Sequence, residues 1–199
     1  MEVRVDGTEW EVHKFGGSSL KKSELFSKVS QILGKVKTAK KASVVSAVYG
    51  VTDLLLSAAN KAKDGLDIID SIASIRKKHF NIIDDLFKLG PYGKELKVNL
   101  EKDLVSLLHL LKTIEMSSSA SETLMEIIMG YGEIWSAQIL NKLLLSQNKK
   151  AQWLNAREVL YIKDNSPDLE IDWELSKNKL EDKLKGFDDH FLIITGFVA

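Results

Sequence analysis

The sequence predicts an α/β fold, in which a mainly parallel sheet is sandwiched by helices. Strand and helix patterns alternate over residues 3–48, and they alternate again from residue 151 onward. A strand–helix–strand order implies parallel strands joined by a right-handed crossover. Between these two parts, residues 52–115 have a helical pattern throughout. We therefore expect a helical insert in the middle of the chain.

The first part of the chain begins with a predicted hairpin. Residues 3–12 surround an Asp6-Gly7 pair, which is a common two-residue hairpin turn. From Ser23, apolar residues recur at helical spacing to residue 36, and the lysines of residues 35–41 are expected to close that helix with positive charge. Residues 42–48 are rich in valine, which is typical of a buried parallel strand.

The helical insert and the segment after it carry clear boundary signals. Asp64-Gly65 and Gly90-Pro91 separate three helical segments, and Ser121 is a candidate N-cap for the next helix. Gly130 and Gly132 interrupt that helix, and each costs about 1 kcal/mol relative to alanine. Their presence predicts a bend or a close approach to another segment.

The last third predicts strands at residues 151–154 and 191–198, with an extended piece at 159–162 and a loop at 164–168. Asp172 is expected to cap a helix that runs to residue 185.

Composition excludes several classes of function. At 199 residues the chain is long enough for one domain with a real core. The formal net charge of zero provides no basic field for nucleic acid or an anionic membrane, so neither partner is expected. Cysteine is absent, and the 4 histidines show no metal-ligand spacing, so no metal site is predicted. A polar N-terminus and the lack of a long apolar run favour a cytoplasmic protein.

One short segment predicts chemistry. An apolar strand ends in Lys14 and Phe15, and two glycines and two serines precede the next helix. Backbone N–H groups at such a helix start are unpaired and suit an anion, and the lysine adds a mobile positive charge. The spacing fits neither a Walker A loop nor a dinucleotide fingerprint. The alternative is a tight turn in which the glycines supply positive φ.

Four segments in the same order resemble those of aspartate kinases, which are members of the amino acid kinase superfamily. They are HKFGGSSL at residues 13–20, VVSA and GVTD within 44–53, GYGEIWSAQIL at 130–140, and AQWLNARE at 151–158 with the later TGF at 195–197. The first and third segments look most like aspartate kinases that are fused to homoserine dehydrogenase. The resemblance spans nearly the whole chain and implies the amino acid kinase fold.

The resemblance implies transfer of the γ-phosphate of ATP, with Mg²⁺, to the side-chain carboxylate of L-aspartate, the first step towards lysine, threonine and methionine. Lys14 would be catalytic and would stabilise the charge of the transition state. The residues implied to bind the nucleotide phosphates are Lys14, Phe15, Gly16, Gly17 and Ser18. The residues implied to bind aspartate are Ser46, Thr52 and Glu133, of which the glutamate would hold the α-amino group.

Each of these residues also has a structural interpretation. Lys14 can be a solvated strand end, Ser46 and Thr52 can be helix caps, and Glu133 can be an exposed helical glutamate. Arg157 can hold a loop or contact substrate. Aspartate is usual in the family at position 155, where this chain has asparagine, so the resemblance implies no charge pairing there.

The resemblance also implies that residues 1–199 are the N-terminal, aspartate-binding part of a longer enzyme. The nucleotide-binding half would follow, the parent would be a homo-oligomer, and the fragment alone would lack measurable kinase activity. Three alternatives remain. The chain can belong to another amino acid kinase, acting on glutamate or N-acetylglutamate, against which the GYGE segment and the helical insert argue. It can also be a non-catalytic aspartate-binding module, or a purely structural helical domain.

Overall fold

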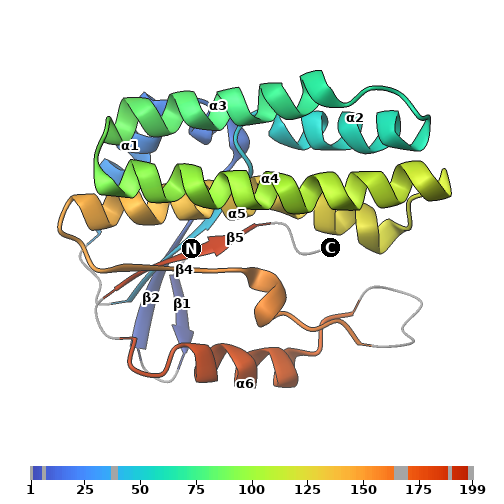
Figure 1. Ribbon diagram of the computed structural model, residues 1–199. Coiled ribbons are helices and arrows are strands. Elements are labelled where there is room, and N and C mark those ends of the chain that lie inside the picture. Colours follow the sequence, from blue (N-terminus) through green and yellow to red (C-terminus); the bar gives the residue numbers. More distant parts are fainter. Residues whose placement is uncertain (1, 6–7, 37–39, 164–169, 188–189, 197–199) are drawn as a thin grey trace.

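The protein folds as a single sheet between two unequal helical layers (Figure 1). The computed structural model describes residues 2–5, 8–36, 40–163, 170–187 and 190–196. The sheet has five strands in the order β1-β2-β3-β5-β4. All neighbouring pairs are parallel except β1 and β2, which form the predicted antiparallel hairpin. The predicted α/β class with a mainly parallel sheet is confirmed, and the Asp6-Gly7 turn lies outside the described residues.

The strands are short and their parallel register is continuous across the sheet. Phe15 lies beside Val45, and Val45 lies beside Thr195, so the parallel strands β2, β3 and β5 end at the same level. The strand bounds are Glu2–Val5 (β1), Thr8–Phe15 (β2), Lys40–Val45 (β3), Ala151–Leu154 (β4) and Phe191–Thr195 (β5).

The helices begin and end close to the predicted signals. Ser121 Oγ accepts a hydrogen bond from the N–H of Leu124 at 3.2 Å, and Asp172 Oδ1 accepts one from Leu175 at 2.9 Å, so both predicted caps are confirmed. The helix bounds are Gly17–Leu20 (η1, 3-10), Ser23–Leu33 (α1), Val51–Lys63 (α2), Ile69–Phe87 (α3), Pro91–Ser117 (α4), Glu122–Ser146 (α5), Ala156–Glu158 (η2, 3-10) and Trp173–Lys183 (α6).

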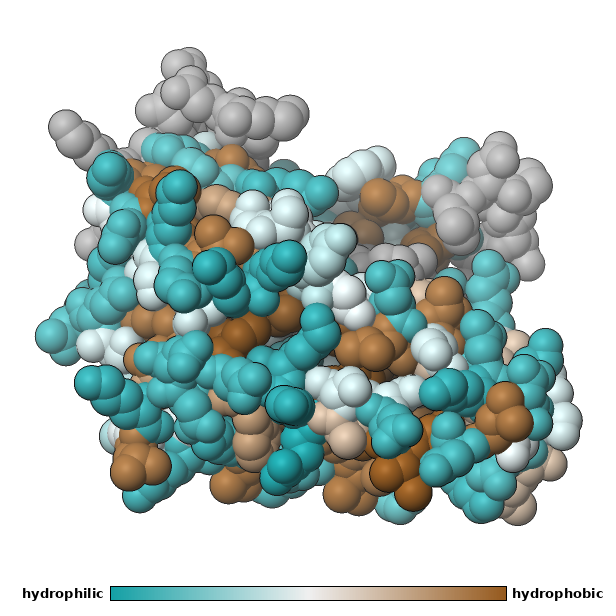
Figure 2. Space-filling view, turned by 90° about the horizontal axis from the view of Figure 1, so that it is seen from above, coloured by the Kyte–Doolittle hydropathy of each residue, from teal (hydrophilic) through white to brown (hydrophobic). Residues whose placement is uncertain are grey.

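Helix α5 connects the sheet to the helical insert. It packs directly on β3, β4 and β5, and on its other side it contacts α2, α3 and α4 (Figure 1). The main core therefore runs from the sheet through α5 into the outer helices, whereas α6 covers the opposite face over a small cluster. Seen from above, the outer helical surface mixes hydrophilic side chains with scattered apolar ones (Figure 2). In the part of the chain that the structure describes, no helix combines the length and apolarity that a bilayer crossing requires.

Three local predictions were wrong. The first helix ends at Leu33 with Gly34 as its C-cap, and its last turn contains no basic residue. Lys40 and Lys41 instead begin β3, where their ammonium groups lie over the rings of Trp10 and Phe191 at 5.6 and 4.8 Å from the ring centroids. Cation–π contacts of this kind stabilise the two lysines at the start of β3, where the sequence had predicted a solvated helix end.

The other two differences concern predicted strands. The third strand stops at Val45 and not at residue 48. The segment predicted as extended at 159–162 is not a strand, since the chain turns through η2 and only Ile162 makes an isolated bridge, with Ile171. The loop predicted at 164–168 and the end of the last predicted strand at 197–198 lie outside the described residues.

Candidate functional site

The candidate site lies beyond the carboxyl ends of the parallel strands. Strands β2, β3, β4 and β5 all point the same way, so the segments that follow them gather at one edge of the sheet. In open α/β sheets, ligands bind in the crevice outside this edge. Three of the predicted segments meet there: the glycine loop after β2, the loop after β3, and the Gly130–Glu133 turn of α5.

The glycine loop packs closely on the loop after β3 at Gly17 and is open at Gly16. A Cβ atom on Gly17 would lie 3.0 Å from the backbone oxygen of Ala47, whereas a Cβ on Gly16 would meet nothing within 4 Å. Gly16 has a φ of −76°, and Gly17 is not among the described glycines with positive φ, so the alternative in which this turn needs positive φ is wrong. The glycines serve a close backbone approach on one side and leave open space on the other, as a phosphate cradle requires.

Lys14 stands exposed at the end of β2, one residue before Phe15. Strand alternation places its side chain on the sheet face of Val12, which belongs to the small cluster beneath α6. Phe15 points to the other face and joins the main core. Lys14 and α5 are therefore on opposite faces of the sheet but at the same edge, and a ligand that contacts both must lie beyond the strand ends.

The loop after β3 presents two hydroxyl groups. The backbone N–H of Ser46 donates to the carbonyl of Phe15 at 3.0 Å, which ties this loop to the end of β2. Ser46 is half-buried and Thr52 is exposed in the first turn of α2. The N-cap of α2 is Gly50, at a φ of 75°, and no side chain caps that helix. Neither hydroxyl therefore has the capping role that was the alternative interpretation.

The glycines of α5 bring this helix into contact with both neighbouring loops. The helix is continuous through Gly130 and Gly132, so they mark close approach and not a bend. A Cβ on Gly132 would lie 2.7 Å from the Cβ of Ala47, and a Cβ on Gly130 would lie 3.1 Å from the guanidinium of Arg157. Glu133 directly follows and is only 8% exposed, so the alternative of an exposed helical glutamate is wrong.

A polar network lies behind this turn, on the side of α5 that faces the helical insert. The Trp135 indole N–H donates to Asp103 Oδ2 at 2.9 Å, and the ring meets His79 edge-on with centroids 4.9 Å apart. His79 Nδ1 bonds to the Ile75 carbonyl at 2.8 Å, and burial lowers the pKa of His79 to about 4. Burial also raises the pKa of Asp103, against the smaller opposing effect of its bond to Trp135.

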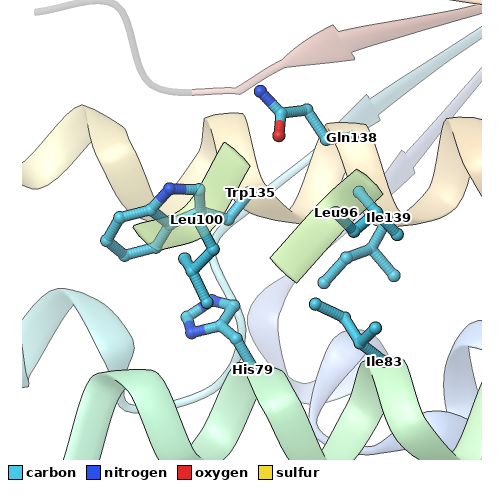
Figure 3. Close-up of a pocket in the computed structure, with 7 residues that line it drawn as sticks. All are labelled: His79, Ile83, Leu96, Leu100, Trp135, Gln138 and Ile139. Carbon is cyan, nitrogen blue, oxygen red and sulfur yellow. The ribbon is translucent and has the colours of Figure 1, made fainter. Parts of the chain in front are cut away.

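A cavity of about 10 Å³ adjoins the His79 and Trp135 rings (Figure 3). A volume of this size holds no more than about one water molecule. Apolar side chains of α3, α4 and α5 form most of its wall, and the amide of Gln138 points away from the His79 ring (Figure 3). The cavity is therefore a packing feature of the helical insert and not a substrate pocket.

Two cations near the loop after β3 were not predicted. Lys21 Nζ lies 5.1 Å from the centroid of the Tyr49 ring, and Lys78 Nζ donates to the Tyr49 carbonyl at 3.2 Å. Lys78 comes from α3, far from Tyr49 in sequence, so no local pattern could have indicated the pair. Among the described residues, no group of three histidine or acidic side chains is placed to hold a metal ion.

Fold and candidate site together define an α/β protein with a glycine loop at the carboxyl edge of its parallel strands. The chain belongs to the amino acid kinase family, whose model matches residues 9–199. Bifunctional aspartokinase/homoserine dehydrogenase 1 of Zea mays is 30% identical over 195 residues, which are 97% of this chain and 21% of the maize protein. The bifunctional enzyme 2 of Escherichia coli is 27% identical over 95% of this chain and 23% of its own length. The chain thus spans less than a quarter of these relatives.

Solved structures agree with the sequence relatives. Aspartokinase III of E. coli, in complex with aspartate and ADP, matches 94% of this chain and 40% of its own with a TM-score of 0.76 at 25% identity. Aspartate kinase of Clostridium acetobutylicum matches 92% of this chain and 38% of its own with a TM-score of 0.67 at 26% identity. The predicted resemblance to aspartate kinases is confirmed.

Proposed function

We propose that residues 1–199 form the aspartate-binding part of an aspartate kinase, which transfers the γ-phosphate of ATP to the side-chain carboxylate of L-aspartate. One observation carries this proposal: the glycine loop and the Gly132–Glu133 turn both abut Ala47. The proposed phosphate cradle and the turn that carries the acidic side chain therefore lie beside the same loop. The named aspartate kinase relatives support the choice of substrate.

In the proposed reaction, a carboxylate oxygen of aspartate attacks the γ-phosphorus and ADP leaves, forming an acyl phosphate. The open space beside Gly16 fits a phosphate group, and the Lys14 ammonium would neutralise charge that builds on the transferred group. The buried Glu133 carboxylate would bind the α-ammonium of aspartate, because a carboxylate in a dry site is stabilised by a cation. Ser46 and Thr52 would donate hydrogen bonds to the bound aspartate.

Mg²⁺ enters this proposal through ATP. Protein-bound Mg²⁺ is generally held by substrate phosphates and one or two carboxylates. A cytoplasmic location and a homo-oligomeric parent remain predictions.

The test is aspartate-dependent release of ADP by the full-length protein, with L-glutamate and N-acetyl-L-glutamate as alternative acceptors. We expect Lys14→Ala to lower kcat by about 100- to 1000-fold, the usual effect of removing one transition-state donor. Glu133→Gln should instead raise KM for aspartate, and Lys177→Ala, on the exposed surface of α6, should change neither constant. Turnover with glutamate and not aspartate, or an unchanged KM in Glu133→Gln, would reject the proposal.

A further inference from the structure

The short turn after β4 is fastened to the end of β5. Thr195 Oγ1 accepts a hydrogen bond from the Ala156 N–H at 2.9 Å, and Asn155 Oδ1 accepts one from the Arg157 N–H at 3.2 Å. An asparagine oxygen caps this turn as well as an aspartate oxygen would, so the uncharged Asn155 can still hold the turn in place. The turn is therefore a fixed base from which the Arg157 side chain extends.

Arg157 reaches from this base to α5. Its Nη2 donates to the carbonyl of Glu126 at 2.5 Å. A Cβ on Gly130 would lie 3.1 Å from each of Cζ, Nη1 and Nη2 of Arg157. Three equal distances mean that the flat face of the guanidinium lies on the helix at Gly130. Lysine cannot reproduce this contact, since its ammonium is a compact group without a planar face.

The contact between Arg157 and Gly130 lies beside Glu133 on the surface of α5. Successive residues of an α-helix are rotated by about 100°, so Glu133 projects about 60° from Gly130 and about 100° from Gly132. Gly130 faces Arg157 and Gly132 faces Ala47. Glu133 therefore projects into the sector between the turn after β4 and the loop after β3, and contacts on both sides of it set the rotation of the helix.

We propose that Arg157 is a positioning residue, which holds α5 at Gly130 and so aims Glu133 into the aspartate site. This inference rests on the proposed function. Gly130 and Arg157 act as a pair, because any side chain at position 130 would displace the guanidinium. Arg157 touches helix backbone and not substrate, so its loss loosens one helical turn and weakens aspartate binding without removing a reacting group.

The test combines hydrogen exchange with kinetics on the full-length protein. In Arg157→Ala we expect the amides of residues 130–134 to exchange about tenfold faster, as local opening becomes easier. KM for aspartate should rise about tenfold or more, while kcat stays within about threefold. Arg157→Lys should restore only part of the protection, and Gly130→Ala should reproduce the effects of Arg157→Ala. The double variant should be no worse than either single variant.

Lys183→Ala is the matched control. It removes the exposed ion pair between Lys183 and Glu158, which belongs to the same turn, but leaves the contact with α5 intact. We expect it to alter neither exchange nor KM.

Unchanged exchange in both Arg157→Ala and Gly130→Ala would overturn the inference. A raised KM with unchanged exchange would also overturn it, because Arg157 would then contact aspartate directly. If the wild type releases no ADP with aspartate, the proposed function fails, and the role at an aspartate site fails with it. In that case the exchange measurement still decides separately whether Arg157 holds α5.

Discussion

The two faces of the sheet are covered very differently. On one face, α5 packs on three strands and the insert helices continue the same core outward. On the other, α6 covers a cluster in which five of the described side chains are buried: Ala42, Leu154, Val159, Phe187 and Leu192. The thick face supplies most of the buried apolar area, and therefore most of the stability. The thin face leaves the end of β2 accessible, and this is where Lys14 is exposed.

The largest expected effect is the loss of stability when a buried leucine is truncated, and this loss should differ between the two faces of the sheet. Leu107 of α4 is 0% exposed and Leu192 of β5 is 2% exposed, yet they belong to the large and the small cluster respectively. We expect Leu107→Ala to cost about 3–5 kcal/mol and Leu192→Ala about 2–3 kcal/mol, because the small cluster can collapse around a cavity. Urea unfolding measures both. Equal costs would mean that the thin face is packed as rigidly as the thick one.

The second prediction concerns pH and the buried His79. Its pKa is about 4 in the folded protein against an ordinary value of 6.5. Between these values the unfolded chain binds a proton that the folded protein does not. The free energy of unfolding should therefore fall as pH falls from about 6.5 to 4, by about 3 kcal/mol in total. The raised pKa of Asp103 acts in the opposite direction and offsets part of this loss.

His79→Leu isolates the histidine contribution. Between about pH 4 and 6.5, the free energy of unfolding should depend less steeply on pH in this variant. The reason is that unfolding then takes up about one proton fewer. If His79→Leu keeps the wild-type slope, the pKa of His79 does not fall on folding and the prediction is wrong.

A smaller effect is expected at the glycine loop. Gly17→Ala places a Cβ 3.0 Å from the Ala47 oxygen, and we expect a loss of about 1–3 kcal/mol from the strain. Gly16→Ala is the matched variant, since its Cβ meets nothing within 4 Å, and its stability should change by less than about 0.5 kcal/mol. Thermal unfolding separates the two, and a destabilised Gly16→Ala would contradict the open space beside the loop.

The smallest effects are expected at the helix caps. Ser121→Ala in α5 and Asp172→Ala in α6 each remove one hydrogen bond to a helix N-terminus and should cost about 1 kcal/mol. Helix α5 is held along its length by the core, so its first turn should fray alone. In α6 only Ser176 is buried, so loss of Asp172 should raise hydrogen exchange along the whole helix. If faster exchange is confined to the first turn of both helices, α6 is held more firmly than its single buried side chain suggests.

Much of the fold could be predicted because its signals are local. Periodicity indicated the insert helices, and Ser121 and Asp172 were identified as caps from residue type and position. The errors came where tertiary contacts outweighed local pattern. Lys40 and Lys41 looked like the end of a helix, but aromatic rings on neighbouring strands hold them in β3.

The candidate site was predictable as a set of segments but not as a geometry. Gly17 and Gly132 could be singled out as unusual residues, yet nothing in the sequence indicates that both touch Ala47. The pairing of Gly130 with Arg157 depends in the same way on contacts between distant segments. Such contacts form only when the sheet and α5 assemble.

By itself, the sequence determined the fold class, the order of strands and helices, and the residue types available at the carboxyl edge. These depend on periodicity, turn residues and caps, which act over a few neighbouring residues. Only the tertiary structure decided that Glu133 is buried, that Lys14 lies on the face of the sheet opposite to α5, and that the Arg157 guanidinium lies flat on Gly130. The physical reason is that burial and close backbone approach depend on packing between segments that are far apart in the chain.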